Sequence, residues 1–334
     1  MTRAGAGCEG GARERVPARL LSSGMPAAGF VVNRTRVRDG AAFRRRCQQA
    51  AAASGWEPLF AVTTGDDRGR GLAQAAVAAG ASLIFAAGGD GTVRACAEAL
   101  AGTDVPLAIL PMGTANLAAR ALGVPSGLAP ALATGFGGSD RRIDLAVAEG
   151  MTFAAMAGIG LDAAVVGATP QVFKDGLGWL AYAGAGLLRL PGRPSWFTVH
   201  LDDTEPLAIR ARSVVAGNAG LLPGGFTLLP GAQLDDGLLD VGILGPAHAV
   251  GWLRVAHRVL TGSHRDDRHL TRHRARRVRI TADTELPREV DGEVITPGNS
   301  LTVSLLSSAL TVRVPAARPG RPAAPAGDRG SRSP

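Results

Sequence analysis

The segment "FAAGGDGTVRACAEAL" (85–100) predicts a strand, a tight turn and a helix in immediate succession. Its apolar run ends in five residues of unusual composition: Gly88, Gly89, Asp90, Gly91 and Thr92. Glycine-rich turns at the start of a helix bind phosphate groups, because free backbone N–H groups and the helix dipole favour negative charge there. Asp90 would repel a phosphate unless a cation lay between them, so this turn predicts Mg²⁺ held by carboxylate, water and phosphate. A simpler interpretation makes Asp90 the N-cap of the helix.

A second corner of the same kind follows on the next predicted strand. In "LPMGTANLAAR" (110–120), Gly113 and Thr114 stand between an apolar strand and a helix. The glycines allow close approach of the backbone to a ligand, and the hydroxyls of Thr92 and Thr114 add hydrogen-bond donors. Neither corner has the G-x-x-x-x-G-K-[ST] pattern of a Walker A loop. Two such corners on consecutive strands favour a ligand site over ordinary turn glycines.

The wider pattern divides the chain into two folded parts. Continuous apolar strands alternate with helices in the first part, which predicts a doubly wound, mostly parallel sheet covered on both faces. Short Val-, Leu- and Thr-rich segments separated by turns fill the second part, which predicts a mostly antiparallel β-sandwich. The predicted divisions are a disordered segment over 1–27, an α/β nucleotide-binding domain over 28–142, a β-rich domain over 143–315 and a disordered tail over 316–334.

Composition limits where the protein works. The 334 residues carry a formal charge of +8, and much of the excess lies in the arginine-rich ends. No apolar run is long enough to span a bilayer, and the N-terminus lacks the apolar core of a signal peptide. The three widely spaced cysteines argue against a disulfide framework. We therefore predict a cytoplasmic protein, and leave open a peripheral position at the inner face of the membrane.

The segment "HRDDRHLTRHRARRVR" (264–279) is strongly basic. It suits contact with an anionic membrane surface, and a solvated loop is the alternative interpretation. Nucleic-acid binding is not expected, because aromatic residues are not interleaved with the basic ones.

A series of motifs, in order, resembles the diacylglycerol kinase catalytic domain family, and bacterial lipid kinases of the diacylglycerol and sphingosine kinase type in particular. The matching segments are the two glycine corners, "VVNRTRV" (31–37), "TTGDDRG" (63–69), "FAAMAGIGLDA" (153–163), "GNAGLLPGGFTLLPGAQLDDGLLDV" (217–241) and "EVDGE" (289–293). NAD kinases and phosphofructokinases share the Gly-Gly-Asp-Gly-Thr loop, but not the whole series. The resemblance covers about residues 28–315.

The resemblance implies an enzyme that transfers the γ-phosphate of ATP to a lipid hydroxyl, with Mg²⁺, in a cleft between the two domains. The implied substrate is diacylglycerol or a related membrane lipid alcohol. The implied nucleotide contacts are Thr63, Gly88, Gly89, Asp90, Gly91, Thr92, Gly113 and Thr114. Glu293 is the implied general base, beside the catalytic Asp90. Judged without the resemblance, Asp291 and Gly292 are simply good hairpin-turn residues.

The resemblance implies two further features in the second half. A second Mg²⁺ would be held by the Asp236 carboxylate and the carbonyls of Gln233 and Leu238, and would have a structural role. A turn without a metal is the alternative for this segment. Lys174 aligns with a lysine of the family and is the implied substrate-side residue, although a solvated helix residue is an equal interpretation.

The sequence departs from the family pattern at both glycine corners. The family commonly has Asn-Glu where this chain has Arg94 and Ala95, and Asn-Asp where it has Asn116 and Leu117. These changes remove acidic groups from the expected metal and nucleotide network. Two alternatives therefore stay open: an NAD kinase-like enzyme, and a nucleotide- or lipid-binding regulator without turnover. A homodimer is also left open.

Overall fold

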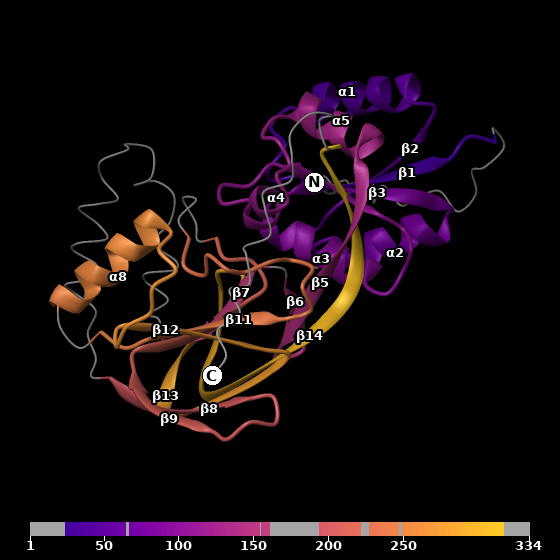
Figure 1. Cartoon of the computed structure of the whole chain (residues 1–334). Helices are drawn as coiled ribbons and strands as arrows, with labels where there is room; N and C mark the ends of the chain where they lie inside the picture. The colour runs from indigo at the N-terminus through magenta and orange to yellow at the C-terminus, as the bar shows by residue number, and fades with distance from the viewer. Residues whose placement is uncertain are drawn as a thin grey trace, which may run out of the picture.

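The strand and helix around the first glycine corner are present in the computed structural model as β3 (Ala81–Gly88) and α3 (Asp90–Leu100). The structure describes residues 24–64, 67–153, 155–160, 194–221, 227–246 and 249–316. Within them the chain forms two joined regions, one of alternating strands and helices and one of mostly antiparallel strands (Figure 1).

The first region is built on a parallel sheet in the order β4-β3-β1-β2. The other three strands are β1 (Ala27–Val32), β2 (Glu57–Val62) and β4 (Leu107–Pro111). The helices are α1 (Gly40–Ala53), α2 (Arg70–Ala78), α4 (Leu117–Ala121) and α5 (Leu128–Gly137). Helices α1 and α5 contact each other on one face, and α2 and α3 on the other (Figure 1). This two-sided cover explains the continuous apolar strands and confirms the predicted fold class.

Three phenylalanines show how the sheet is aligned. Phe30 of β1 lies opposite Phe60 of β2 and Phe85 of β3 in the strand register. Its ring stacks on both, with centroids 5.0 Å from Phe60 and 4.5 Å from Phe85. Phe30 and Phe85 are fully buried, and a register slip would break this stacking.

The second region consists of antiparallel strands with one described helix, α8 (Ala249–Thr261). Its strands are β5 (Ser139–Ala148), β6 (Met151–Phe153), β7 (Met156–Ile159), β8 (Ser195–Leu201), β9 (Leu207–Ala211), β10 (Ser213–Gly217), β11 (Leu239–Leu244), β12 (Leu270–Ala275) and β13 (Arg277–Val290). The sheet order β12-β11-β10-β7-β13 continues into the first region through the last strand, β14 (Glu293–Val314).

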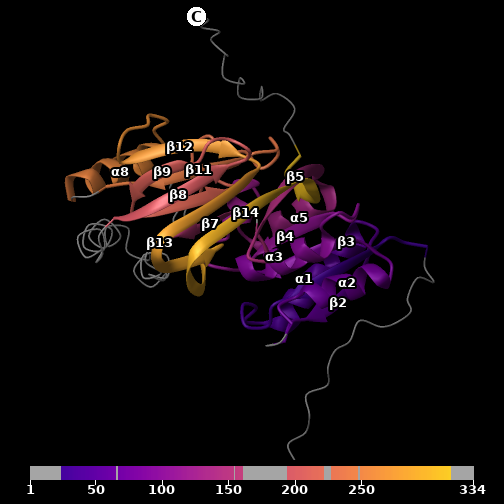
Figure 2. The same cartoon turned by 90° about the horizontal axis from the view of Figure 1, so that it is seen from below.

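Strand β14 belongs to both hydrophobic cores. Leu301 and Val303 lie in the core of the second region, and Leu310 and Val312 lie in the core of the first. The structure has one strand with a register shift between Leu306 and Leu310. Figure 2 shows β14 running from the second region into the first. The predicted domain boundary at residue 142 stays a prediction, and it falls within β5.

Two local details differ from the sequence patterns. Helix α5 was not predicted; Pro130 lies in its first turn, where proline is tolerated. Asp90 is not the N-cap of α3: Gly89 occupies that position and Asp90 is the first helical residue. None of the described helices has the length and apolar content needed to cross a membrane.

Candidate active site

The two glycine corners are in direct contact. Gly88 at the end of β3 is paired with Pro111 at the end of β4, and Met112 donates its N–H to the Gly88 carbonyl at 2.9 Å. A Cβ added to Gly113 would lie 2.6 Å from the Cα of Gly89. Glycine is therefore required at residue 113 for the two corners to pack together.

Asp90 links the two corners. Its Oδ1 accepts the backbone N–H of Leu117, the first residue of α4, at 2.7 Å. Among the described residues, no group donates a hydrogen bond to the other oxygen, Oδ2. The carboxylate thus stabilises the second corner through one of its two oxygens.

The threonines predicted to contact nucleotide have three different environments. Thr92 is buried, and its Oγ1 accepts a hydrogen bond from Nδ2 of Asn33 at 3.1 Å. Thr63 follows β2, is half-buried, and donates its backbone N–H to Val32. Thr114 is exposed beside the second corner. Of the three hydroxyls, only that of Thr92 has a hydrogen-bond partner among the described residues.

Gly91 has open space where a side chain would be. A Cβ added there would meet no heavy atom within 4 Å, and its backbone is not in the left-handed region. Neither packing nor backbone conformation therefore requires glycine at this position.

Glu293 is placed by the hairpin between β13 and β14. Asp291 and Gly292 form its turn with φ of 49° and 77°, the two positive values that a two-residue turn of this kind needs. Asp291 Oδ1 accepts the N–H groups of Ala155 and Met156 at 3.0 and 3.2 Å. The turn is thereby tied to the start of β7.

The buried Glu289 stabilises the same turn from within. Its Oε2 accepts the N–H of Gly292 at 2.7 Å, and the residue is 4% exposed. Burial raises the pKa of Glu289 to about 7, although the Gly292 hydrogen bond acts in the opposite direction. Glu289 and Asp291 therefore support the turn, and Glu293 is the acid that reaches the first region.

Two arginines of the first region hold Glu293. Arg68 Nη1 lies 2.8 Å from both carboxylate oxygens, and Arg94 Nη2 bonds to Oε2. Partial burial raises the pKa of Glu293, but the hydrogen bonds from Arg68 and Arg94 outweigh it and leave the pKa below its ordinary value. Arg94 also donates to the Val290 carbonyl at 3.4 Å, so it contacts the hairpin at two points.

Sequence reasoning did not identify these arginines as site residues. Arg94 was noted only as a departure from the family pattern, yet it lies four residues after Asp90 on α3. That spacing places both on one helix face, and was a signal for Arg94. Arg68 offered no such signal, since it lies 225 residues from Glu293 in sequence.

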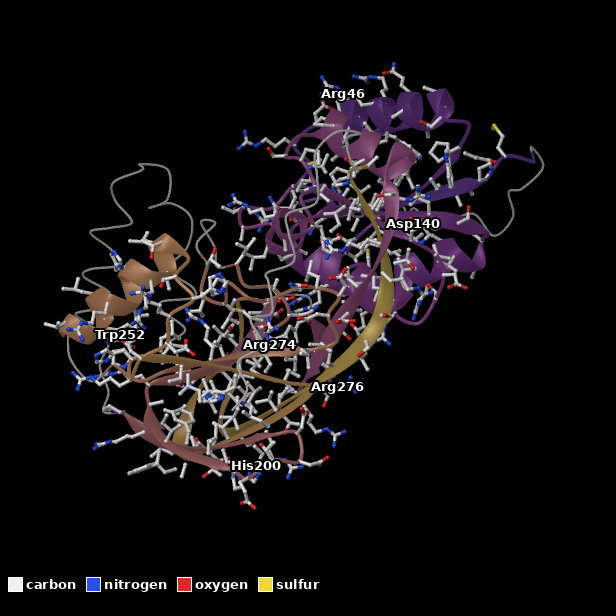
Figure 3. The ribbon with its side chains drawn as sticks, in the orientation of Figure 1. Arg46, Asp140, His200, Trp252, Arg274 and Arg276 are labelled. Atoms are coloured by element: carbon white, nitrogen blue, oxygen red, sulfur yellow. The ribbon has the colours of Figure 1, made fainter. Side chains whose placement is uncertain are left out.

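The predicted structural metal turn is held by arginines and backbone. Asp236 Oδ1 accepts the N–H of Leu238 at 3.1 Å, and Arg274 Nη1 lies 3.9 Å from its Oδ2. Asp235 pairs with Arg141 at 2.8 Å. Figure 3 shows Arg274 among the strands of the second region.

A buried carboxylate beside this turn, Asp240, was missed from sequence. Arg274 Nε bonds its Oδ1 at 3.2 Å, while its buried Oδ2 has no hydrogen-bond partner among the described residues. Burial raises the pKa of Asp240, and the Arg274 charge lowers it. The orphaned oxygen and the oxygen donors of the turn fit a hard cation such as Mg²⁺.

The described residues contain no group of three or more His, Cys, Asp and Glu side chains arranged for a metal. That finding does not count carbonyls, which make up two of the three predicted ligands, so Gln233, Asp236 and Leu238 stay predicted. Lys174 lies outside the described residues.

Family models match both regions. Residues 28–148 match the diacylglycerol kinase catalytic domain, and residues 155–314 match the YegS C-terminal NAD kinase beta sandwich-like domain. A Pseudomonas fluorescens protein named "Probable lipid kinase YegS-like" is 36% identical over 275 residues, covering 81% of this chain and 90% of that one.

Two further relatives agree. The "Diacylglycerol kinase" of Bacillus subtilis is 35% identical over 217 residues, covering 63% of this chain and 71% of that one. The crystal structure of a diacylglycerol kinase from Bacillus anthracis has the same fold, with a TM-score of 0.64, 22% identity, and coverage of 87% of this chain and 97% of that one. The names of the Pseudomonas fluorescens and Bacillus subtilis relatives favour the lipid kinase over the NAD kinase alternative. The chain belongs to the bacterial lipid kinase family with a diacylglycerol kinase catalytic domain.

Proposed function

We propose that this lipid kinase transfers the γ-phosphate of ATP to the hydroxyl of diacylglycerol or a related lipid alcohol. The observation that carries the proposal is the bridge made by Arg94. This residue connects the helix that begins at Asp90 with Glu293, the predicted base, which belongs to the other region. A donor bound at the glycine corners and an acceptor bound near Glu293 would therefore be neighbours.

The glycine corners support the nucleotide position. The open space at Gly91 and the exposed Thr114 leave room for phosphates at the start of α3. Asp90 Oδ2 fits a divalent cation, because its donor chemistry is that of a Mg²⁺ ligand and the described residues do not occupy it. Mg²⁺ held there would neutralise charge on the phosphates.

Glu293 and its two arginines support the chemistry. In the structure both guanidinium groups neutralise the carboxylate. When the phosphates of ATP arrive, Arg68 and Arg94 can turn to the phosphoryl oxygens, which are stronger acceptors in aggregate. Glu293 then accepts the proton of the lipid hydroxyl while the hydroxyl oxygen bonds to the γ-phosphorus. The bond between the γ-phosphorus and the bridging oxygen of the β-phosphate breaks, and ADP is released.

The remaining predicted roles complete the proposal. Asp236, with the carbonyls of Gln233 and Leu238, would hold the structural Mg²⁺ of the second region. Lys174 would act on the substrate side. The lipid would be drawn from a membrane to which the enzyme binds peripherally.

The test is phosphate transfer by the purified full chain. The protein is incubated with γ-labelled ATP, Mg²⁺ and mixed micelles that contain diacylglycerol, a sphingoid base, phosphatidylglycerol or a polyprenol. We expect label in the diacylglycerol product, and at least about 10²-fold slower labelling after Glu293→Gln. Label in another lipid alone would correct the acceptor. Label in NAD, in a parallel incubation with NAD in place of the micelles, would favour the second enzyme class. ATP binding without transfer to any acceptor would support the regulator instead.

A further inference from the structure

Helix α8 carries large apolar side chains on the face that it turns to solvent. Val250 is 62% exposed, Leu253 65% and Leu260 44%. Their spacing places them on one side of the helix, with the exposed Arg254 and His257 between them. Seven large hydrophobic side chains are exposed in the described part of the chain, and three of them lie on this helix.

The opposite face of α8 is already anchored. Trp252 and Val255 are 6% and 4% exposed and pack in a small core with Leu228, Leu229 and Leu270. Figure 3 shows Trp252 on α8, far from Arg46 on α1. The helix therefore does not need its outer apolar residues to stay attached, and large apolar side chains exposed together on one helix face favour an interaction surface.

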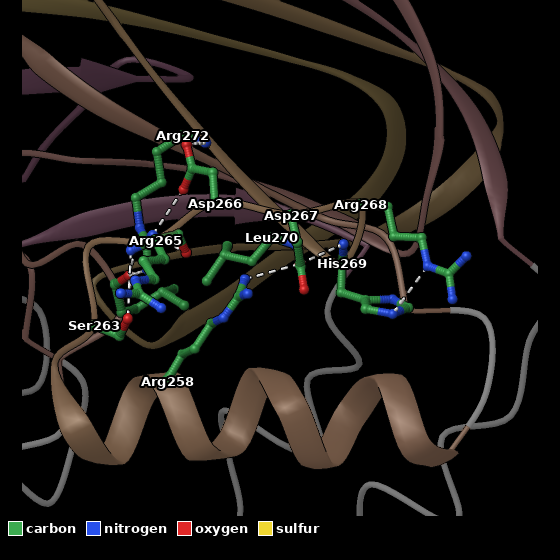
Figure 4. Close-up of polar contacts among 10 residues, drawn as sticks. Arg258, Ser263, Arg265, Asp266, Asp267, Arg268, His269, Leu270 and Arg272 are labelled. Carbon is green, nitrogen blue, oxygen red and sulfur yellow. Dashed lines mark hydrogen bonds and ion pairs between the residues drawn. The ribbon is translucent and has the colours of Figure 1, made fainter.

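The charge around this strip is positive. Helix α8 contains no acidic residue. The segment after it has two acids, and both are neutralised: Asp266 pairs with Arg272 and Asp267 pairs with Arg258, each at 2.8 Å (Figure 4).

Three arginines on α8 and in the segment after it remain for a partner. Arg254, Arg265 and Arg268 are exposed, and none has an acidic partner among the described residues. Exposed apolar side chains together with such cations complement a surface whose outer layer is anionic and whose interior is apolar.

We propose that the α8 docking surface, formed by Val250, Leu253, Arg254, Leu260, Arg265 and Arg268, binds an anionic bilayer. The helix lies in the plane of the interface, with its aliphatic side chains at the acyl boundary and its arginines on lipid phosphates. A second copy of the chain is a poor partner for this surface, because a symmetric dimer contact would pair the surface with itself and bring its positive charges together. A small dissolved anion would leave the apolar side chains unused.

This inference deepens the function proposed above, since a lipid kinase must take its acceptor from a membrane. Vesicle binding is measured without turnover, so the two proposals can fail separately. The full chain is floated with vesicles of phosphatidylcholine, with and without phosphatidylglycerol. We expect binding only to the anionic vesicles, and weaker binding at high salt.

The variant Leu253→Gln is expected to lower the vesicle partition coefficient about tenfold, because it removes one aliphatic side chain from the acyl boundary. Replacing Arg254, Arg265 and Arg268 together by glutamine should remove the preference for anionic vesicles. Leu306→Gln is the matched control, since Leu306 is 42% exposed on β14, outside this surface, and should bind as the wild type does.

Three outcomes decide the inference. Equal vesicle binding by Leu253→Gln and Leu306→Gln would overturn it. A shift of Leu253→Gln from dimer to monomer, with vesicle binding unchanged, would also overturn it by assigning the face to a second copy. Full activity of Leu253→Gln on a short-chain, water-soluble diacylglycerol, with loss of activity on vesicles, would confirm that α8 delivers the enzyme to the bilayer. If the wild type has no activity on any acceptor, the proposed lipid kinase function is rejected. The vesicle-binding result does not depend on that activity and still tests this inference.

Discussion

The corner between β3 and α3 and the hairpin between β13 and β14 both contain an Asp-Gly pair, yet their acids are used differently. At the corner, Asp90 uses one oxygen to hold α4 and leaves the other free of described partners. At the hairpin, Asp291 is bonded to backbone N–H groups, and Glu293 is held by two arginines. The same dipeptide thus supplies a carboxylate that links two corners in one region and a turn support in the other.

Under the proposed function, this difference separates the side that binds the phosphate donor from the side that binds the acceptor. At the corner, Asp90 has one oxygen without a partner among the described residues. At the hairpin, Arg68 and Arg94 hold the Glu293 carboxylate and lower its pKa. Five substitutions test this contrast.

Glu293→Gln has the largest expected effect, a fall in kcat of about 10²–10⁴-fold, since a general base contributes that much. The amide can still bond to Arg68 and Arg94, so the hairpin should keep its place. Steady-state phosphate transfer gives the rate. Glu285→Gln, an exposed change on β13, is the control. An unchanged kcat would remove Glu293 from the mechanism.

Asp90→Asn should lower kcat/KM by about 10²–10³-fold, through loss of a charge that organises the site. The asparagine Oδ1 can still accept the Leu117 N–H, so thermal unfolding should be little changed. When activity is titrated with Mg²⁺, the variant should need a higher Mg²⁺ concentration than the wild type to reach half of its maximal activity. Asp203→Asn, at an exposed position, is the matched control, and equal activities of both variants would contradict the assignment.

Arg94→Asn introduces the residue that the family commonly has, and should lower kcat by at least about tenfold, since hydrogen bonds to charged groups contribute about 1.5 kcal/mol or more. It should also move the acidic limb of the kcat/KM profile to higher pH, because Glu293 loses a cation that lowers its pKa. Arg70→Asn breaks an exposed pair with Glu98 instead and should leave the profile in place. An unmoved limb in Arg94→Asn would reject its action on Glu293.

Gly91→Ala should raise the KM for ATP about fivefold, because a methyl group in ligand space costs roughly 1 kcal/mol. The free protein should gain stability, since alanine favours a helix and a Cβ meets no atom there. Comparison of Tm with and without ATP separates the two effects. A higher Tm with an unchanged KM would show that phosphates do not bind beside Gly91.

Glu289→Gln should have the smallest effect on activity and change the pH dependence of stability. The pKa of Glu289 rises from 4.5 to about 7 on folding, so the folded state binds this proton more tightly. The wild-type free energy of unfolding therefore falls as pH rises from about 4.5 through about 7, and this contribution is absent in the variant. The Tm of Glu289→Gln should rise relative to wild type between about pH 5 and pH 8. A constant difference in Tm over that range would contradict the buried titration.

Most elements of the first region could be predicted because their signals are local. Asp39 caps α1, with its Oδ1 accepting the Ala42 N–H at 2.9 Å, and aspartate is a common N-cap residue. The register that stacks Phe30 on Phe60 and Phe85 was not predicted, because continuous apolar strands covered on both faces do not mark one register. Helix α5, with Pro130 in its first turn, was not predicted either, and the continuous β14 contains a register shift between Leu306 and Leu310.

The candidate site was predictable only in part. Gly89, Asp90 and Glu293 stand in recognisable motifs, but their partners come from distant segments. Neither the bond from Asp90 to Leu117 nor the pairs of Glu293 with Arg68 and Arg94 has a signature in local sequence, since each depends on how two elements pack.

Two kinds of information are therefore separated in this protein. Neighbouring residues determine the local structure, because backbone geometry and turn preferences act over a few positions. Examples are the strand and helix periods and the positive-φ residues of the Asp291-Gly292 turn. The charge state of each carboxylate is not. Glu289 and Glu293 are four residues apart and have opposite pKa shifts. Only the packing of the two regions decides that burial dominates at the first and the arginine pairs dominate at the second.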